Sequence, residues 1–340
     1  WRFIMATLKV NTLSGIGTEG PVLNGGLKFR SLNYMTLPKG NTTQRGRGLA
    51  VIMGGIYPET TRMETYSLIS SSNSVEFGTL SGGNNLAWGG ALASATRGVI
   101  GGGNGQIADM EYVEIQTLGN SISFSNLSVG RRHAVGVSNN IRGMWGGGET
   151  AGGTTQTDTI DFVTIATRAD AQDFGNLTDS RRGCAGAASP TRGLFASGDS
   201  PGAVNIIDYI TIASTGDATD FGDTQEARTN STGCSNTTRA VFGGGSVSPT
   251  YVNTLDFVTI ATLGDAKDFG DLFQAVYSIR GCSASHIRGN WNGGYSTAYL
   301  NIIQTITIAT TGNAVDWGDM AAAKGGYNST TSDSHGGLSE

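Results

Sequence analysis

Cysteine and histidine are scarce in this chain, with three residues of each among 340. Cys184, Cys234 and Cys282 are too few and odd in number for a disulfide framework. They are also spaced too widely, and without histidine partners, for a zinc site. We therefore expect three small buried side chains. So few histidines also leave no Ser–His–Asp set with meaningful spacing, and we assign no catalytic, metal-binding or cofactor-binding residues.

Charge is low and slightly acidic: 14% of the residues are charged, and the formal net charge is −5. No basic run occurs, which argues against a nucleic-acid partner. No stretch of 18 apolar residues exists, so we expect no membrane-spanning helix. The first residues, WRFIMATLKV (1–10), lack the apolar centre and cleavage site of a signal peptide, and none is expected.

Glycine, in contrast, is abundant, at 53 of 340 residues, about twice ordinary usage. Together with many Thr, Ser, Ile and Val residues, this composition favours short strands joined by tight turns. The apolar residues are periodic, which argues against disorder.

One pattern recurs six times, and its clearest copy reads TRAVFGGG (238–245) followed by NTLDFVTIATLGDAKDFGDL (253–272). An arginine opens the copies at positions 47, 97, 142, 192, 239 and 288, in steps of 50, 45, 50, 47 and 49. A second marker, an aromatic residue before Gly or Ser, recurs in steps of 47, 50, 47, 48 and 48 at Phe77, Phe124, Phe174, Phe221, Phe269 and Trp317. Two markers with one period near 48 predict a propeller or a solenoid.

Each copy contains four short strands, which we call a to d. In the clearest copy they fall at 231–237, at the segment after Arg239, at 254–262 and from Phe269 onward. Four strands in a meander form one propeller blade. In strand c, Leu255 and Phe257 alternate with Val258 and Ile260, so both sides are apolar, as a sheet covered on both faces requires.

The two ends of the repeat predict the number of blades. The first copy has no strand a before Arg47, whereas residues 321–337 match the strand-a region of other copies and then stop. The C-terminal strand would therefore complete the first blade and remove the free sheet edges. We predict an all-β fold: a six-bladed propeller of four-stranded blades over 47–338, preceded by a short β-rich attachment segment, 1–46.

The order of arginine, small strand, aromatic-Gly-Gly, aromatic strand and a final Phe or Trp resembles the kelch repeat over residues 47–337. Kelch blades carry the glycine pair after strand b and an aromatic residue on strand d. Two departures occur: five of the six strand-d aromatics are Phe, and Ser197-Gly198 replaces one glycine pair.

A second resemblance is to virion proteins of marine bacteriophages, especially those of cyanobacteria. It rests on MATLKVNTLSGIG (5–17), LPKG (37–40) and copies such as IDYITIASTGDATDFGD (207–223). The resemblance implies a structural protein on the virion exterior, of the tail fibre, tail or capsid-decoration type. Its partners would be other virion subunits, bound through 1–46, and a host-surface glycan or protein; a homo-oligomer is compatible with this role.

The leader itself predicts two strands, at 6–13 and 27–37. The low charge and apolar alternation also allow a second arrangement, in which the leader is a strap packed on the propeller.

Acidic turns repeat with the blades, as in Asp217, Asp220 and Asp223 and again in Asp265, Asp268 and Asp271. Oxygen ligands at this spacing could suit Ca²⁺, but the EF-hand spacing is absent and Asp is an ordinary turn residue. Because the c–d and a–b turns share one face, we expect pairs of the type Asp268–Arg288 between blades. All three histidines fall in strand-a regions near the axis, where a metal cluster is a further alternative.

The b–c loops vary freely between copies, whereas the c–d turns barely change. Variable loops on a rigid scaffold are where binding usually occurs. The candidate binding-face residues are therefore Tyr57, Tyr251, Tyr295 and Tyr299, which could stack on sugars or dock protein. The alternative is plain solvent-exposed variation.

Three functions remain at this stage. The sequences of the leader and of the repeats favour a non-enzymatic phage virion protein. A free carbohydrate-binding lectin of a bacterium is the alternative, and the lack of a catalytic constellation disfavours an enzyme.

Overall fold

The computed structural model describes residues 22–23, 27–28, 48–56, 60–150, 155–277, 281–324 and 326–338. The chain divides into two units, residues 1–47 with 340 and residues 48–339. In the first unit, β1 (Val22–Leu23) pairs with β2 (Leu27–Lys28) in an antiparallel hairpin. The strand predicted at 6–13 lies outside the described residues, and of the one predicted at 27–37 only 27–28 are described.

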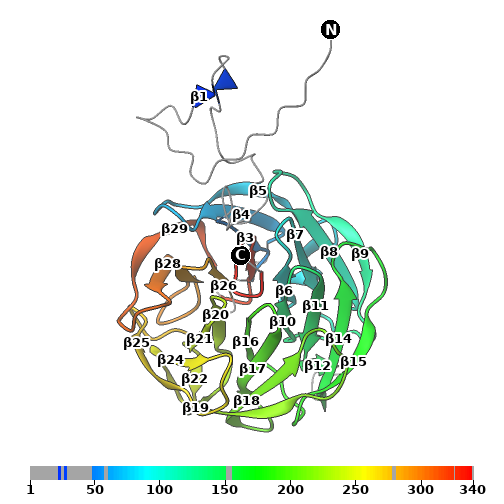
Figure 1. The fold of residues 1–340 in the computed structure, drawn as a ribbon, viewed down its shortest axis with the longest axis vertical. Coiled ribbons are helices and arrows are strands. Elements are labelled where there is room, and N and C mark those ends of the chain that lie inside the picture. Colours follow the sequence, from blue (N-terminus) through cyan, green and yellow to red (C-terminus); the bar gives the residue numbers. More distant parts are fainter. Residues whose placement is uncertain are drawn as a thin grey trace. The chain divides into compact units, whose positions relative to one another are not determined.

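The second unit is a six-bladed β-propeller of four-stranded antiparallel sheets, as predicted (Figure 1). The strands of each blade are given in the order a to d, with the innermost strand a first. Blade 1 consists of β30 (Ser329–Ser332), β3 (Leu49–Met53), β4 (Arg62–Ser67) and β5 (Val75–Thr79); blade 2 of β6 (Gly90–Ala93), β7 (Arg97–Gly101), β8 (Asp109–Glu114) and β9 (Ile122–Asn126); and blade 3 of β10 (Val135–Ser138), β11 (Arg142–Gly146), β14 (Thr159–Thr164) and β15 (Gln172–Asn176). Blade 4 consists of β16 (Ala185–Ala188), β17 (Arg192–Asp199), β18 (Ala203–Thr211) and β19 (Thr219–Arg228); blade 5 of β20 (Thr232–Ser235), β21 (Arg239–Gly243), β24 (Thr254–Thr259) and β25 (Lys267–Asp271); and blade 6 of β26 (Gly281–Ala284), β27 (Arg288–Asn292), β28 (Leu300–Thr307) and β29 (Val315–Lys324).

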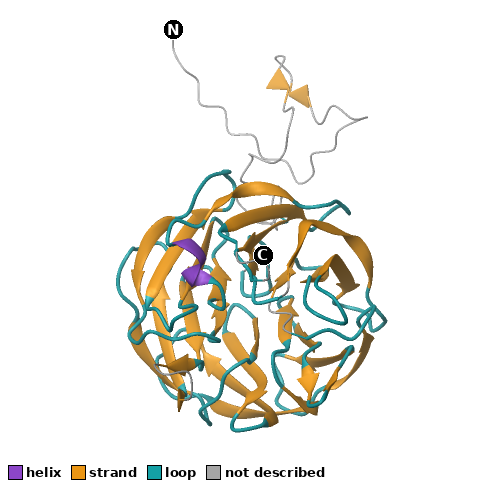
Figure 2. Ribbon diagram, turned by 180° about the vertical axis from the view of Figure 1, so that it is seen from behind, coloured by secondary structure: helices purple, strands orange, loops and turns teal. Residues whose placement is uncertain are grey.

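Little else is regular in the described part of the propeller (Figure 2). Two b–c loops carry small hairpins, β12 (Glu149–Thr150) with β13 (Thr155–Gln156) and β22 (Ser246–Val247) with β23 (Thr250–Tyr251). A single 3-10 turn covers Gly83–Leu86. Among the described residues, no helix has the length and apolarity needed to cross a membrane.

The first blade is closed by the C-terminal strand, as predicted. β30 pairs with β3, with Ser332 opposite Ala50 and Ser329 opposite Met53. The strand register corrects the alignment of the first repeat with the others. Leu49 pairs with Ser67 in blade 1, at the position where Arg97 pairs with Glu114 in blade 2. In the first blade this position therefore holds a leucine rather than Arg47, and Arg47 itself lies outside the described residues.

Apolar side chains on both faces of strand c pack between neighbouring blades. Leu255 of blade 5 and Ile306 of blade 6 lie in one buried cluster around Trp291, which has no exposed surface. Burying apolar area on both faces is the main favourable term in folding, and here it also joins adjacent blades.

The turn acids join blades through backbone groups. In blade 5, Asp265 Oδ1 accepts a hydrogen bond from the backbone N–H of Asp223 in blade 4, at 3.1 Å. Equivalent side chains bridge every pair of neighbouring blades: Asn73 to Asp319, Asn120 to Thr79, Asp170 to Asn126, Asp217 to Asn176 and Asn313 to Asp271.

The repeat arginines also reach between blades, but not to those acids. Arg192 stacks on Tyr209 of its own blade, 4.8 Å from the ring centre, and donates to the backbone oxygen of Ile260 in the next blade at 2.8 Å. Arg142 and Arg239 repeat both contacts. The predicted Arg–Asp pairing is therefore wrong: a guanidinium on an aromatic face points at the carbonyls that end strand c, while the turn carboxylates cap exposed N–H groups.

Candidate functional site

The b–c loops and the d–a loops meet on one face of the propeller, around its axis. Isolated antiparallel bridges tie the two kinds of loop together in four blades: Arg132 with Glu149, Arg182 with Asp199, Thr229 with Ser246 and Tyr277 with Tyr295. These bridges continue the a–b strand pairing beyond each blade. Both kinds of loop are therefore tied to the scaffold by backbone hydrogen bonds.

A partial ring of four backbone hydrogen bonds runs around the axis on this face and links blades 1 to 5 in turn. The N–H of Trp88 donates to the oxygen of Tyr327 at 3.2 Å, and that of His133 donates to Trp88 at 2.9 Å. Gly183 then donates to His133 at 3.2 Å, and Asn230 donates to Gly183 at 3.0 Å. We call this ring, made by Trp88, His133, Gly183, Asn230 and Tyr327, the axial mouth.

All five residues of the axial mouth have left-handed backbones. The φ angles are +73° at Trp88, +61° at His133, +68° at Gly183, +55° at Asn230 and +54° at Tyr327. A residue with a Cβ loses about 1–2 kcal/mol in this conformation, less when it is Asn. Glycine adopts it at no steric cost, so four blades carry a strained residue where blade 4 carries glycine.

The predicted tyrosines are brought together beside the mouth. Tyr251 lies at a centroid distance of 6.1 Å from Tyr295, which lies 5.2 Å from Tyr299. Tyr251 also stacks on Tyr277 at 5.3 Å and an interplanar angle of 16°. Tyr251 and Tyr299 keep 38% and 43% of their surface exposed. Tyr57 lies outside the described residues.

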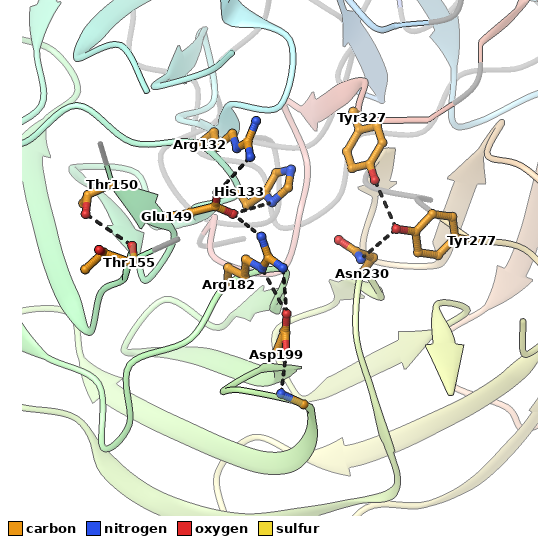
Figure 3. Close-up of polar contacts among 11 residues, drawn as sticks. Arg132, His133, Glu149, Thr150, Thr155, Arg182, Asp199, Asn230, Tyr277 and Tyr327 are labelled. Atoms are coloured by element: carbon orange, nitrogen blue, oxygen red, sulfur yellow. Dashed lines mark hydrogen bonds and ion pairs between the residues drawn. The ribbon is translucent and has the colours of Figure 1, made fainter. Parts of the chain in front are cut away.

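The row of rings continues across the mouth. The hydroxyl of Tyr277 lies 3.3 Å from the hydroxyl of Tyr327 (Figure 3). The side-chain amide of Asn230 donates a hydrogen bond to the hydroxyl of Tyr277 at 3.4 Å. The ring of Tyr327 stacks on His133 at 5.5 Å and tilts against Trp88 at 4.7 Å.

Sequence reasoning missed Trp88, Tyr277 and Tyr327 because they belong to d–a loops, which it treated as connections. An aromatic residue two to four positions before strand a was the signal available.

A charged network completes the mouth on the side of blades 3 and 4. Glu149 is fully buried and lies between Arg132, which donates to Oε1 at 2.8 Å, and Arg182, which donates to Oε2. Arg182 also donates to Asp199 at 3.0 Å, and His133 Nδ1 lies 3.8 Å from Glu149 (Figure 3). Burial alone would lower the pKa of Arg182, but its hydrogen bonds to Glu149 and Asp199 raise it. Two cations and two anions therefore balance here.

Beneath the mouth, buried ion pairs anchor the d–a loops to strand c of the blade that each loop enters. The pairs are Arg131–Asp161 at 2.8 Å, Arg181–Asp208 at 2.8 Å and Arg228–Asp256 at 2.7 Å. Burial lowers the pKa of the Arg131 and Arg228 guanidinium groups, while the paired carboxylates raise it. A buried pair of this kind holds its loop in place, since either charge alone would be costly.

The axis itself leaves little room. Two cavities of about 60 and 70 Å³ are lined mostly by small residues of the innermost strands. Sites that enclose a small-molecule ligand usually measure about 300–1,000 Å³. The side chains of Cys184, Cys234 and Cys282 are buried, as predicted.

The far end of the axis is closed by the C-terminal residues. His335 Nε2 lies 2.9 Å from the backbone oxygen of Ala93 and 3.3 Å from Ser138 Oγ, and Gly336 donates to Ser235 at 2.9 Å. These partners come from blades 2, 3 and 5, so the tail spans the channel. Burial lowers the pKa of His335 to about 4, assisted by nearby His286.

The structure separates His133 from the other two histidines. His133 stacks on Tyr327 at the mouth, whereas His335 follows strand β30 and lies near His286. The described residues contain no group of three or more His, Cys, Asp or Glu side chains that could hold a metal ion.

Comparison with known proteins adds no assignment. No protein-family model matches the chain, and no curated protein matches it.

Proposed function

We propose that this chain is a non-enzymatic structural protein of a bacteriophage virion, of the tail fibre, tail or capsid-decoration type. In this proposal its propeller faces outward for attachment to the host surface or to neighbouring subunits, and residues 1–46 bind other virion subunits. The likeness of residues 5–17, 37–40 and 207–223 to marine phage virion proteins supports the virion part.

One observation carries the binding part: Tyr251, Tyr295 and Tyr299, from the b–c loops of blades 5 and 6, meet Tyr277 in one partly exposed aromatic group. Tyrosine combines a large apolar ring with a polar tip and is enriched at binding interfaces. The blades that carry these loops are locked together by paired turns and strands, so little entropy is lost when a partner binds.

The experiment is antibody labelling of the propeller on purified phage particles, with mass spectrometry of the same particles. Label at fibre tips supports a receptor-binding role, and the purified chain should then block adsorption. Label over the capsid supports decoration. Particles without label or peptide would exclude the virion role and favour the alternative, a free carbohydrate-binding lectin of a bacterium.

A further inference from the structure

The side chains of the axial mouth are not needed for its backbone ring. Each link uses only an N–H and a C=O, and blade 4 makes both of its links with Gly183. The left-handed φ angle that these links require is the one that glycine adopts most readily. Trp88, His133, Asn230 and Tyr327 therefore occupy positions where glycine would fold with less strain. Strained residues of this kind gather at functional sites.

On the side of blades 1, 5 and 6 the mouth presents aromatic and neutral groups. Tyr277 and Tyr327 present hydroxyls, and Asn230 presents an amide that donates to Tyr277. The nearby arginines, Arg132 and Arg182, are each paired with Glu149 or Asp199. A ligand with a free negative charge would have to compete with these carboxylates, whereas a ligand with hydroxyl groups would not.

The shape of the site argues against a protein anchor. A protein hot spot usually inserts a large side chain into a well-packed pocket. The cavity beneath the mouth has only about 60 Å³ and is lined by Gly, Ala, Ser and Thr residues, with Val135, Cys184 and Cys282. The exposed rings of Tyr251 and Tyr299 instead offer flat surfaces on which the C–H face of a pyranose can pack.

We propose that the axial mouth and the adjoining tyrosines form the binding site for a neutral glycan. Pyranose rings stack on Tyr251 and Tyr299, and their hydroxyls bind Tyr277, Tyr327 and Asn230. This inference rests on the proposed binding function and names the ligand class of that same face.

The test is binding of the full chain to a glycan array that carries neutral oligosaccharides and oligosaccharides with uronic or sialic acids. Affinities for the best neutral ligand follow by calorimetry. Tyr277→Phe removes one hydroxyl and should weaken binding about tenfold, the effect of one lost neutral hydrogen bond. Tyr251→Ala removes a stacking surface and should weaken it further.

The decisive variant is Asn230→Gly. It should keep or raise the melting temperature, because glycine suits φ +55°, while binding falls about tenfold. The matched control is Ser197→Gly, which relieves the same backbone conformation (φ +58°) at a fully buried residue and should leave glycan affinity unchanged.

Three results would overturn the proposal: no neutral glycan is bound, acidic glycans are preferred, or Asn230→Gly lowers stability without changing affinity. Labelled particles together with a chain that binds no neutral glycan would refute the ligand class alone. Glycan binding with unlabelled particles would refute the virion role and leave this site standing.

Discussion

Asp333 accepts a hydrogen bond from the backbone N–H of Gly48, 285 positions earlier in the chain, at 2.7 Å. The same carboxylate oxygen accepts from the N–H of Leu49 at 3.0 Å, and the other oxygen accepts from Gln116 at 2.6 Å. In other blades a Ser or Asn side chain makes the equivalent contact across a covalent a–b turn, as Asn139 does with Arg142. In the first blade no covalent turn joins strand a to strand b, because β30 and β3 come from opposite ends of the propeller sequence. Asp333 therefore supplies part of the link that closes the propeller.

Replacement of Asp333 by Ala should cost about 1–3 kcal/mol in the free energy of unfolding, because buried N–H groups lose their acceptor. Asp333→Asn is the matched control, since it keeps an acceptor oxygen of the kind that Asn139 uses. Burial raises the pKa of Asp333, against the lowering effect of the hydrogen bonds from Gly48 and Leu49. A raised acid pKa makes ionisation costly in the folded state, so the part of the stability that depends on this proton is present at low pH and is lost as the pH rises through the folded pKa. The hydrogen bonds from Gly48 and Leu49 do not depend on that proton and remain at pH 7.

Asp333→Asn should therefore be at least as stable as the wild type at pH 7, and Asp333→Ala less stable, in urea unfolding followed by fluorescence. Equal losses in both variants would show that the acceptor is not what matters.

His335 predicts acid sensitivity. Its folded pKa of about 4 lies below the unfolded value near 6.5, so the unfolded chain takes up the proton first. The neutral imidazole contributes stability that is fully present above pH 6.5 and is lost as the pH falls towards 4. The loss should amount to about 3 kcal/mol, from about 1.4 kcal/mol per pH unit.

The measurement compares unfolding of the wild type and His335→Gln between pH 7.5 and 4. The difference between the two should stay constant above pH 6.5 and change steadily from pH 6.5 to 4, because only the wild type carries this titration. Parallel profiles would refute the assignment.

Gly222 should resist substitution because of the neighbouring blade rather than its own backbone alone. A Cβ there would lie 2.6 Å from the carbonyl carbon of Gly264, at a φ of +143°. Gly264 has nearly the same φ, +142°, with nothing within 4 Å of its Cβ position. Gly222→Ala should therefore be less stable than Gly264→Ala by about 1–3 kcal/mol, the usual cost of overpacking. Equal melting temperatures would show that the blades can part without loss.

The ion pair Arg181–Asp208 offers a double-replacement test. In blade 6, Gln304 takes the place of Asp208. Val276 takes the place of Arg181, because the carbonyl of Val276 accepts a hydrogen bond from Gly245 just as the carbonyl of Arg181 accepts one from Gly148. Arg181→Val alone should cost about 3–5 kcal/mol, because Asp208 is left buried and uncompensated. The double variant Arg181→Val/Asp208→Gln should recover much of that loss. A double variant as unstable as the single one would mean that the arginine acts by packing.

The tyrosines show how far the sequence reaches toward the site. Tyr251, Tyr295 and Tyr299 could be selected because their loops differ between otherwise similar copies. Their contacts with Tyr277, and through Tyr277 with Tyr327, could not be predicted, because Tyr277 and Tyr327 are 50 positions apart in the sequence. The repeat arginines show where the sequence pattern misleads. Arg47 fits the repeat by residue type, yet the pairing of Leu49 with Ser67 shows that Leu49 occupies the arginine position in the first blade.

By itself the sequence determined the number of blades, their four-strand order and the use of the C-terminal strand to complete the first blade. Periodicity, alternation and turn residues are local properties, and each copy repeats them. Only the tertiary structure decided which side chains meet across blades: Asp265 with the backbone of Asp223, Asp333 with Gly48, and the residues around the axial mouth. These contacts join residues about 40 to 285 positions apart, and they exist only because the blades close into a ring around one axis.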